Sequence, residues 1–138
     1  MPFIAVEYSY CMIYKGVIIE ESLENKDLLS SVKIVSTKVV DVTDKHKTPW
    51  LKQWTLHTVK ISEKDADKVA QEVSSALDKE RSHSWYADFK NDKFHYIIFL
   101  GKIFKVNRAK PEEYKEVTNY GISLGIPDYQ LDFSPDIQ

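Results

Sequence analysis

The chain has 138 residues, of which 43% are hydrophobic and 29% charged, and its formal net charge is −2. This length suffices for one domain with a sizeable core, so we expect a single domain over residues 1–138. The charge balance argues against a broad nucleic-acid footprint, which requires a basic face, but it is compatible with a small basic patch.

Cys11 is the single cysteine, so no intramolecular disulfide can form, which fits a reducing cytosol. The first residues lack the basic region of a signal peptide. Beyond residue 16, the longest purely apolar run covers residues 96–100 and is far too short to span a membrane. We therefore expect a cytoplasmic protein with no membrane partner.

The first half of the chain predicts mostly strands. Residues 3–20 are rich in aromatic and β-branched types and indicate one or two strands, and residues 22–29 indicate a short helix or a structured turn. Residues 32–42 are β-branched throughout and predict a strand. We expect it to pair with a strand over residues 54–61 across the polar loop of residues 43–49.

A helix follows directly after Ser62, which is a candidate N-cap. Acidic residues at positions 63 and 65 suit the positive end of the helix dipole. The apolar residues recur at helical spacing and form one stripe: Ala66, Val69, Ala70, Val73, Ala76 and Leu77. This pattern is typical of a helix that packs on a sheet.

Three strands joined by two tight turns come next, over residues 85–90, 93–100 and 103–107. Asn91-Asp92 suits a two-residue hairpin turn, and Gly101-Lys102 suits a second one. The middle strand is apolar on both faces, so we expect it to be covered on both sides for much of its length.

The last predicted helix begins near Pro111. Gly121 falls on its apolar face and predicts a close approach to the sheet, and Gly125 is a candidate left-handed C-cap. Residues 129–133 indicate a last short strand.

This order of elements predicts an α+β fold: a two-layer antiparallel sheet with two main helices on one face, of ferredoxin-like type. A helix, three strands and a helix also occur in double-stranded-RNA-binding domains. Those domains contact phosphate with basic residues at the start of the second helix, where this chain has Glu112 and Glu113. We therefore expect no nucleic-acid partner.

The candidate ligand-binding residues lie on the first strand of the meander and in the tail. Tyr86, Asp88 and Lys90 share one face of their strand, which is either solvated or lines a polar pocket. Aspartate is disfavoured inside strands, which favours the pocket. Tyr129 and Asp132 lie in the tail, and Asp132 either bonds to backbone or faces the same pocket as Asp88.

Acid–base chemistry is the second hypothesis for these residues. Asp88 and Asp132 would form a carboxylate pair if they meet, and His57 lies in mid-strand as a packed residue or an acid–base group. The chain contains no metal-binding histidine or cysteine spacing, no glycine-rich phosphate loop and no nucleophile elbow. We expect no metal and no cofactor, and the sequence assigns no catalytic residue.

The strings WYADFKN, YIIFLGKIFKV and YGISLGIPDYQLDF resemble a family of small uncharacterised prokaryotic proteins. The resemblance covers roughly residues 17–133 and is clearest from Trp54 onward. It implies a single cytosolic domain and transfers no activity, cofactor or site residue.

The sequence leaves three functional hypotheses. The first is a small cytosolic domain that binds a small molecule or a protein partner, with a homodimer as a further expectation. The second is a small enzyme that uses Asp88, Asp132 or His57, and the third is a structural subunit of a larger complex. A surplus of aromatic residues, which make up 12% of the chain, favours the first.

Overall fold

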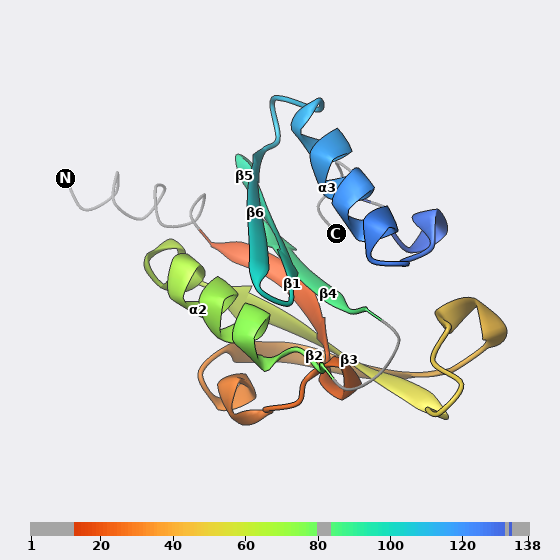
Figure 1. Cartoon of the computed structure of the whole chain (residues 1–138). Helices are drawn as coiled ribbons and strands as arrows, with labels where there is room; N and C mark the ends of the chain where they lie inside the picture. Colours follow the sequence, from red (N-terminus) through yellow and green to blue (C-terminus); the bar gives the residue numbers. More distant parts are fainter. Residues whose placement is uncertain (1–12, 80–83, 132, 134–138) are drawn as a thin grey trace.

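A six-stranded antiparallel sheet and two α-helices form the part of the chain that the computed structural model describes, residues 13–79, 84–131 and 133 (Figure 1). The predicted α+β class is confirmed. With η marking a 3₁₀ helix, the elements in chain order are β1 (Tyr14–Ile19), η1 (Glu20–Ser22), η2 (Asp27–Ser30), β2 (Lys33–Asp41), η3 (Asp44–His46), β3 (Gln53–Ile61), α2 (Glu63–Ala76), β4 (Tyr86–Lys90), β5 (Phe94–Phe99), β6 (Lys102–Asn107), α3 (Glu113–Ser123) and η4 (Asp128–Gln130).

The strand order is β2-β3-β1-β4-β5-β6, and every neighbouring pair is antiparallel. Two strands joined by a helix, β3 and β4, are not neighbours, because β1 lies between them and pairs with both. The predicted ferredoxin-like topology is not confirmed, because this strand order does not match it.

The two helices cover opposite faces of the sheet, as Figure 1 shows. Alternate residues of β5 enter two separate cores: Tyr96 and Ile98 pack with α2 in what we call the α2-side core, and Ile97 and Phe99 pack with α3 in the α3-side core. The prediction that both helices lie on one face is therefore corrected, because β5 needs apolar cover on each side.

The first predicted helix and the hairpin before it form as expected. β2 pairs with β3 across the intervening loop, and α2 begins directly after Ser62. The Ser62 hydroxyl donates to Asp65 Oδ2 at 2.9 Å instead of accepting from the backbone. The whole predicted apolar stripe of α2 is buried in the α2-side core.

Both turns of the meander are shifted by one residue from their predicted positions. Asn91 is the first of the four residues of the first turn, and its side-chain oxygen accepts from the backbone N–H groups of Lys93 and Phe94 at 2.9 and 2.8 Å. This bonding places Asn at the first turn position, where it is favoured. In the second turn Gly101 is the second central residue, with a φ of 71°.

The tail differs from the prediction. Gly125 does take a left-handed φ of 89° after α3. However, a Cβ on Gly121 would meet the side chain of Leu131 at 2.7 Å, so the close approach is to the tail and not to the sheet. The predicted last strand is instead the 3₁₀ helix η4, followed by the buried Leu131.

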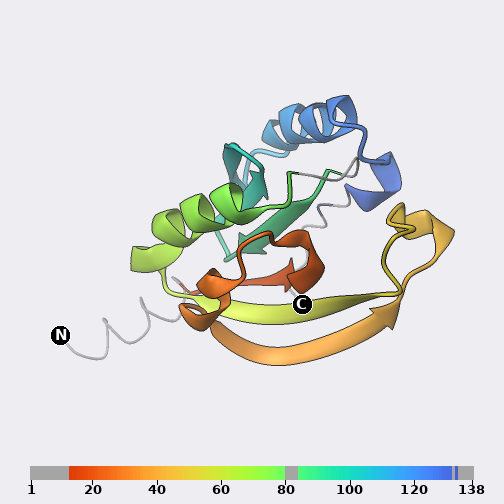
Figure 2. The same ribbon diagram turned by 60° about the horizontal axis from the view of Figure 1, so that its bottom comes forward.

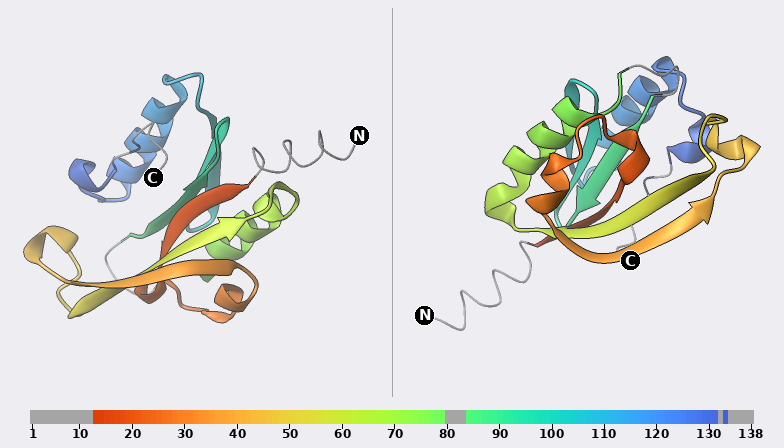
Figure 3. Two further views of the ribbon diagram at one scale, coloured as in Figure 1. Left: turned by 180° about the vertical axis from the view of Figure 1, so that it is seen from behind. Right: turned by 90° about the horizontal axis from the view of Figure 1, so that it is seen from below.

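The loop between β2 and β3 lies against η4, as Figures 2 and 3 show from two directions. Tyr129 Oη donates to the carbonyl oxygen of Lys45 at 2.8 Å, and Gln130 Nε2 donates to the same oxygen at 2.7 Å. Of the strands predicted over residues 3–20, the structure shows β1, and residues 3–12 lie outside the described ranges. In the segment between β1 and β2, Leu23 and Leu28 are buried.

The buried phenol of Tyr96 leads us to expect that the free energy of unfolding depends on pH in the alkaline range. This phenol donates to Asp67, and burial, followed by that bond, raises its pKa above the ordinary value of 10.0. An unfolded tyrosine ionises near pH ~10, so above that pH the unfolded chain loses a proton that the folded protein retains. We therefore expect the free energy of unfolding to fall as the pH rises past that value.

Urea unfolding measured from about pH 8 to about pH 11 tests this. The Tyr96→Phe variant removes the ionising group, so its decline should be shallower than that of the wild type. Tyr129→Phe is the matched control, because the Tyr129 side chain is 54% exposed. Equal declines in wild type and Tyr96→Phe would contradict the prediction.

Candidate functional site

A cavity of about 240 Å³ lies on the sheet face that α3 covers only in part. We call it the sheet cavity. It is lined by Val17 and Ile19 of β1, Trp54 and Leu56 of β3, Ser84, Trp85, Tyr86 and Asp88 in and before β4, and Gln130 of η4. The register explains this wall, because Val17 lies opposite Asp88 and Ile19 lies opposite Leu56. The sheet cavity is therefore mostly apolar, with one carboxylate on its wall.

Asp88 is held in place by a buried histidine. His95 Nε2 lies 2.6 Å from Asp88 Oδ2, and His95 Nδ1 lies 3.0 Å from the Tyr114 hydroxyl. The His95 side chain is 1% exposed, whereas that of Asp88 is 33% exposed. A carboxylate oxygen accepts hydrogen bonds, so His95 Nε2 is the donor to Asp88, while His95 Nδ1 faces the Tyr114 hydroxyl.

Tyr114 remains a proton donor in this chain of contacts. Burial raises the pKa of its phenol, Arg108 opposes that rise, and the negative charge of Asp88 adds to it. The contacts with Tyr114 and Asp88, one at each ring nitrogen, hold the His95 ring in place, and the ring in turn orients Asp88. Since a carboxylate has about four lone-pair sites, Asp88 can accept further hydrogen bonds from a molecule in the sheet cavity.

The structure brings together two of the predicted site residues, Tyr86 and Asp88, at the sheet cavity. Tyr86 lines the sheet cavity beside Asp88, and its hydroxyl donates to the carbonyl oxygen of Gln130. Lys90 follows on the same face of β4, opposite Lys15. Tyr129 does not line the cavity and contacts Lys45 instead. Asp132 lies outside the described residues, so its predicted meeting with Asp88 stays a prediction.

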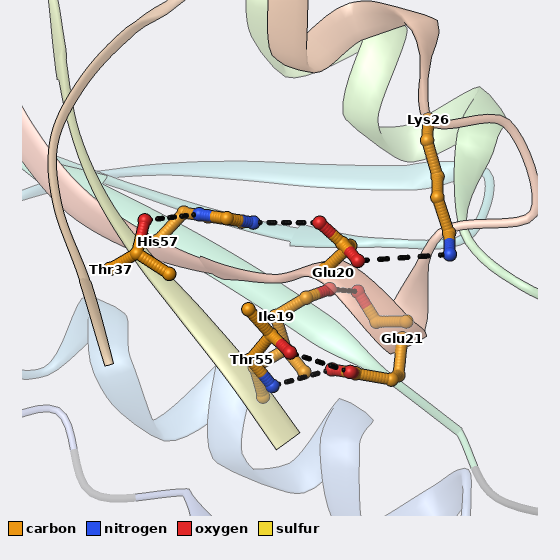
Figure 4. Close-up of polar contacts among 8 residues, drawn as sticks. Ile19, Glu20, Glu21, Lys26, Thr37, Thr55 and His57 are labelled. Carbon is orange, nitrogen blue, oxygen red and sulfur yellow. Dashed lines mark hydrogen bonds and ion pairs between the residues drawn. The ribbon is translucent and has the colours of Figure 1, made fainter. Parts of the chain in front are cut away.

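His57 belongs to a different group on the opposite face, shown in Figure 4. His57 Nε2 lies 3.0 Å from Glu20 Oε1, and His57 Nδ1 lies 2.9 Å from Thr37 Oγ1. Beside it, Glu21 accepts from the backbone N–H and the hydroxyl of Thr55 at 2.6 and 2.8 Å. Both ring nitrogens of His57 are occupied, so this group ties η1 to β3 and β2.

Sequence reasoning missed His95 and Tyr114 as parts of the site. A signal for His95 was present, because a tight hairpin after Lys90 brings Asp88 and His95 to one face within diagonal reach. Tyr114 had no such signal, since its contact depends on where α3 packs. In the structure Tyr114 lies near the start of α3 and packs against the α3-side core.

Comparison with family models, with curated proteins and with solved structures finds no match for this chain. Within the described ranges, no group of three or more His, Cys, Asp or Glu side chains is placed to hold a metal ion. The helices that the structure describes are also too short or too polar to cross a membrane.

Proposed function

We propose that this protein binds a small molecule in the sheet cavity, with a hydrogen-bond donor of the ligand on Asp88. One observation carries the proposal: a partly exposed carboxylate, oriented by a buried histidine, lies on the wall of a mostly apolar cavity. Ligand sites typically combine an apolar lining with few placed polar groups. Val17, Ile19 and Leu56 offer such a lining.

The size of the sheet cavity limits the ligand. A volume of about 240 Å³ accommodates a molecule of one or two rings. Trp54 and Trp85 belong to the wall, so their fluorescence reports on occupancy. The donor on the ligand is a hydroxyl, an amine or a ring N–H, since these are the groups that a carboxylate accepts from.

The Asp88→Asn variant tests this proposal. It removes the charge and retains the shape, and losing a hydrogen bond to a charged acceptor weakens binding by about tenfold or more. The measurement is a thermal-shift screen of small metabolites, followed by titration of each hit with tryptophan fluorescence. Asp92→Asn is the matched control, because Asp92 is exposed in the turn after β4.

The two outcomes are distinct. Hits that weaken in Asp88→Asn and not in Asp92→Asn support the proposal. Hits that bind equally to both variants place the ligand elsewhere and contradict it. If no small molecule binds, a protein partner or a role as a structural subunit takes its place.

A small enzyme is the second candidate, and the contact between Asp88 and His95 favours it. A carboxylate backed by a histidine and a tyrosine can accept a proton from a bound substrate. This function requires turnover, so NMR of each hit incubated with the protein would show conversion to product. Hits that remain unchanged would leave binding as the function.

The remaining expectations stay predictions. A cytosolic location is proposed because the chain has a single cysteine and can form no intramolecular disulfide. A homodimer and membership of the resembling prokaryotic family are likewise proposals, and light scattering of the purified protein tests the first of them.

A further inference from the structure

Four lysines form a row across four adjacent strands. Lys33 of β2 lies opposite Lys60 of β3, Lys60 lies opposite Lys15 of β1, and Lys15 lies opposite Lys90 of β4. Directly opposed residues point to the same face of a sheet. We call these four residues the lysine row. With adjacent strands roughly 4.8 Å apart, the row extends over roughly 14 Å.

The lysine row lies on the same face as the sheet cavity. The neighbours of Lys15 and Lys60 in sequence, Tyr14, Val59 and Ile61, are buried in the α2-side core, so the lysines point the other way. Asp88 precedes Lys90 by two residues, and alternate residues share a face.

Like charges placed directly opposite one another destabilise a sheet. Among the ion pairs between described residues, none involves Lys15, Lys33 or Lys60. A concentrated positive field therefore exists on a chain whose net charge is −2. Such a field attracts an anion, and a bound anion would relieve the repulsion between the lysines.

The sheet cavity adjoins the lysine row. Two residues that line the cavity are close to the row in sequence: Val17 is two residues from Lys15, and Asp88 is two residues from Lys90. Two residues of a strand extend roughly 6.6 Å. A molecule whose uncharged part lies in the cavity can therefore place an anionic group on the lysines.

We propose that the ligand of the sheet cavity is a phosphorylated small molecule. Its uncharged part contacts Asp88, and its phosphate groups lie on Lys15 and Lys60, the two central residues of the lysine row. This inference rests on the proposed function and adds the chemical class of the ligand. Several ammonium groups in one row match the several negative charges of a phosphate ester or a short phosphate chain better than a single carboxylate.

A small ligand is favoured over a nucleic acid. The lysine row is short, and it ends at β5 with His95, which is buried and bonded to Asp88. At the start of α3, Glu112 and Glu113 would repel a longer phosphate backbone. A long polyanion would leave most of its charges without partners on this molecule.

The experiment compares matched compounds with and without phosphate. The panel contains nucleosides with their nucleotides, sugars with their sugar phosphates, and inorganic triphosphate alone. Binding is measured by tryptophan fluorescence at an ionic strength of about 0.01 M, where the Debye length is about 30 Å. We expect phosphorylated members to bind at least about tenfold more tightly than their unphosphorylated partners.

The Lys15→Gln/Lys60→Gln double variant should lose that advantage and bind both members of each pair alike. Because the substitutions remove like-charge repulsion, we expect the double variant to fold at least as well as the wild type. Lys64→Gln/Lys115→Gln is the matched control, with the same change of charge on two exposed helix residues. The control should retain the preference for phosphate.

Other outcomes overturn the inference. If uncharged members bind in an Asp88-dependent way and phosphate adds nothing, the proposed function stands and this inference falls. If inorganic triphosphate binds and every organic member fails, the lysine row binds anions without the cavity, and both proposals fall. If neither triphosphate nor any phosphorylated member binds, or if a single-stranded oligonucleotide binds far more tightly than every small member, the proposed ligand class is wrong.

Discussion

Replacing Gly16 with alanine is expected to destabilise the protein by about 3 kcal/mol or more. Gly16 lies in mid-strand in β1, opposite Val59 on one side and Phe89 on the other. A Cβ at this position would lie 2.0 Å from the carbonyl oxygen of Asp88 and 2.6 Å from Cα of Phe89. Both are backbone atoms of β4, so relief requires β1 and β4 to separate.

Gly121→Ala is the matched control for this prediction. Its added Cβ would meet Leu131 Cδ2 at 2.7 Å and Cδ1 at 2.9 Å, and these atoms end a rotatable side chain. Alanine is also favoured over glycine in a helix interior by about 1 kcal/mol. We therefore expect a net change within about 1 kcal/mol, measured by urea unfolding. A loss from Gly16→Ala no larger than that from Gly121→Ala would show that the approach of β1 to β4 is not rigid.

Replacing His95 with alanine is expected to cost about 3 kcal/mol. The substitution opens space in the interior and removes the partner of both Asp88 and Tyr114, which are themselves partly buried. Losing this support also releases Asp88, so ligand binding should weaken together with stability. Tyr114→Phe removes only one hydrogen bond and should cost about 1–2 kcal/mol.

His57→Ala is the comparison for His95→Ala, because each histidine is buried and bonds through both ring nitrogens. The partners of His57 lie closer to solvent: Thr37 is exposed and the side chain of Glu20 is 35% exposed. Water can satisfy them after the substitution, so we expect a smaller loss than at His95. Urea unfolding and ligand titration of both variants measure the difference, and a larger loss for His57→Ala would contradict this ranking.

The elements that sequence reasoning predicted well depend on local patterns. The helix α2, the hairpin of β2 and β3, and the meander of β4, β5 and β6 each follow from periodicity and turn residues that lie close together in the chain. The position of β1 between β3 and β4 does not, because that pairing joins segments about 40 or more residues apart. The strand order was missed for this reason.

The arrangement of the helices was predictable from β5. Both of its faces are apolar, with Tyr96 and Ile98 on one side and Ile97 and Phe99 on the other, and the sequence accordingly indicated cover on both. The ferredoxin-like hypothesis, with its helices on one face, conflicted with that pattern. The local pattern was the better guide to the layers.

In the candidate site, too, some residues could be predicted from local patterns and others could not. Tyr86 and Asp88 were placed correctly on one face of one strand, because alternation along a strand is local. The lysine row and the apolar wall of Val17, Ile19 and Leu56 were missed, since both require the register of β1 against its neighbours.

Because β1 lies between β3 and β4, it separates the sheet into two parts, which we call leaves: the β2–β3 hairpin on one side and the β4–β6 meander on the other. The β2–β3 hairpin and the β4–β6 meander share no ladder of their own, and six residue pairs join β1 to β3 whereas three join it to β4. The shorter ladder, between β1 and β4, contains the pair of Val17 and Asp88. The sheet cavity therefore lies across the boundary at which the two leaves would separate first. A ligand of the proposed kind would contact both sides of that boundary and hold the two leaves together, so its binding would raise the free energy needed to open the sheet.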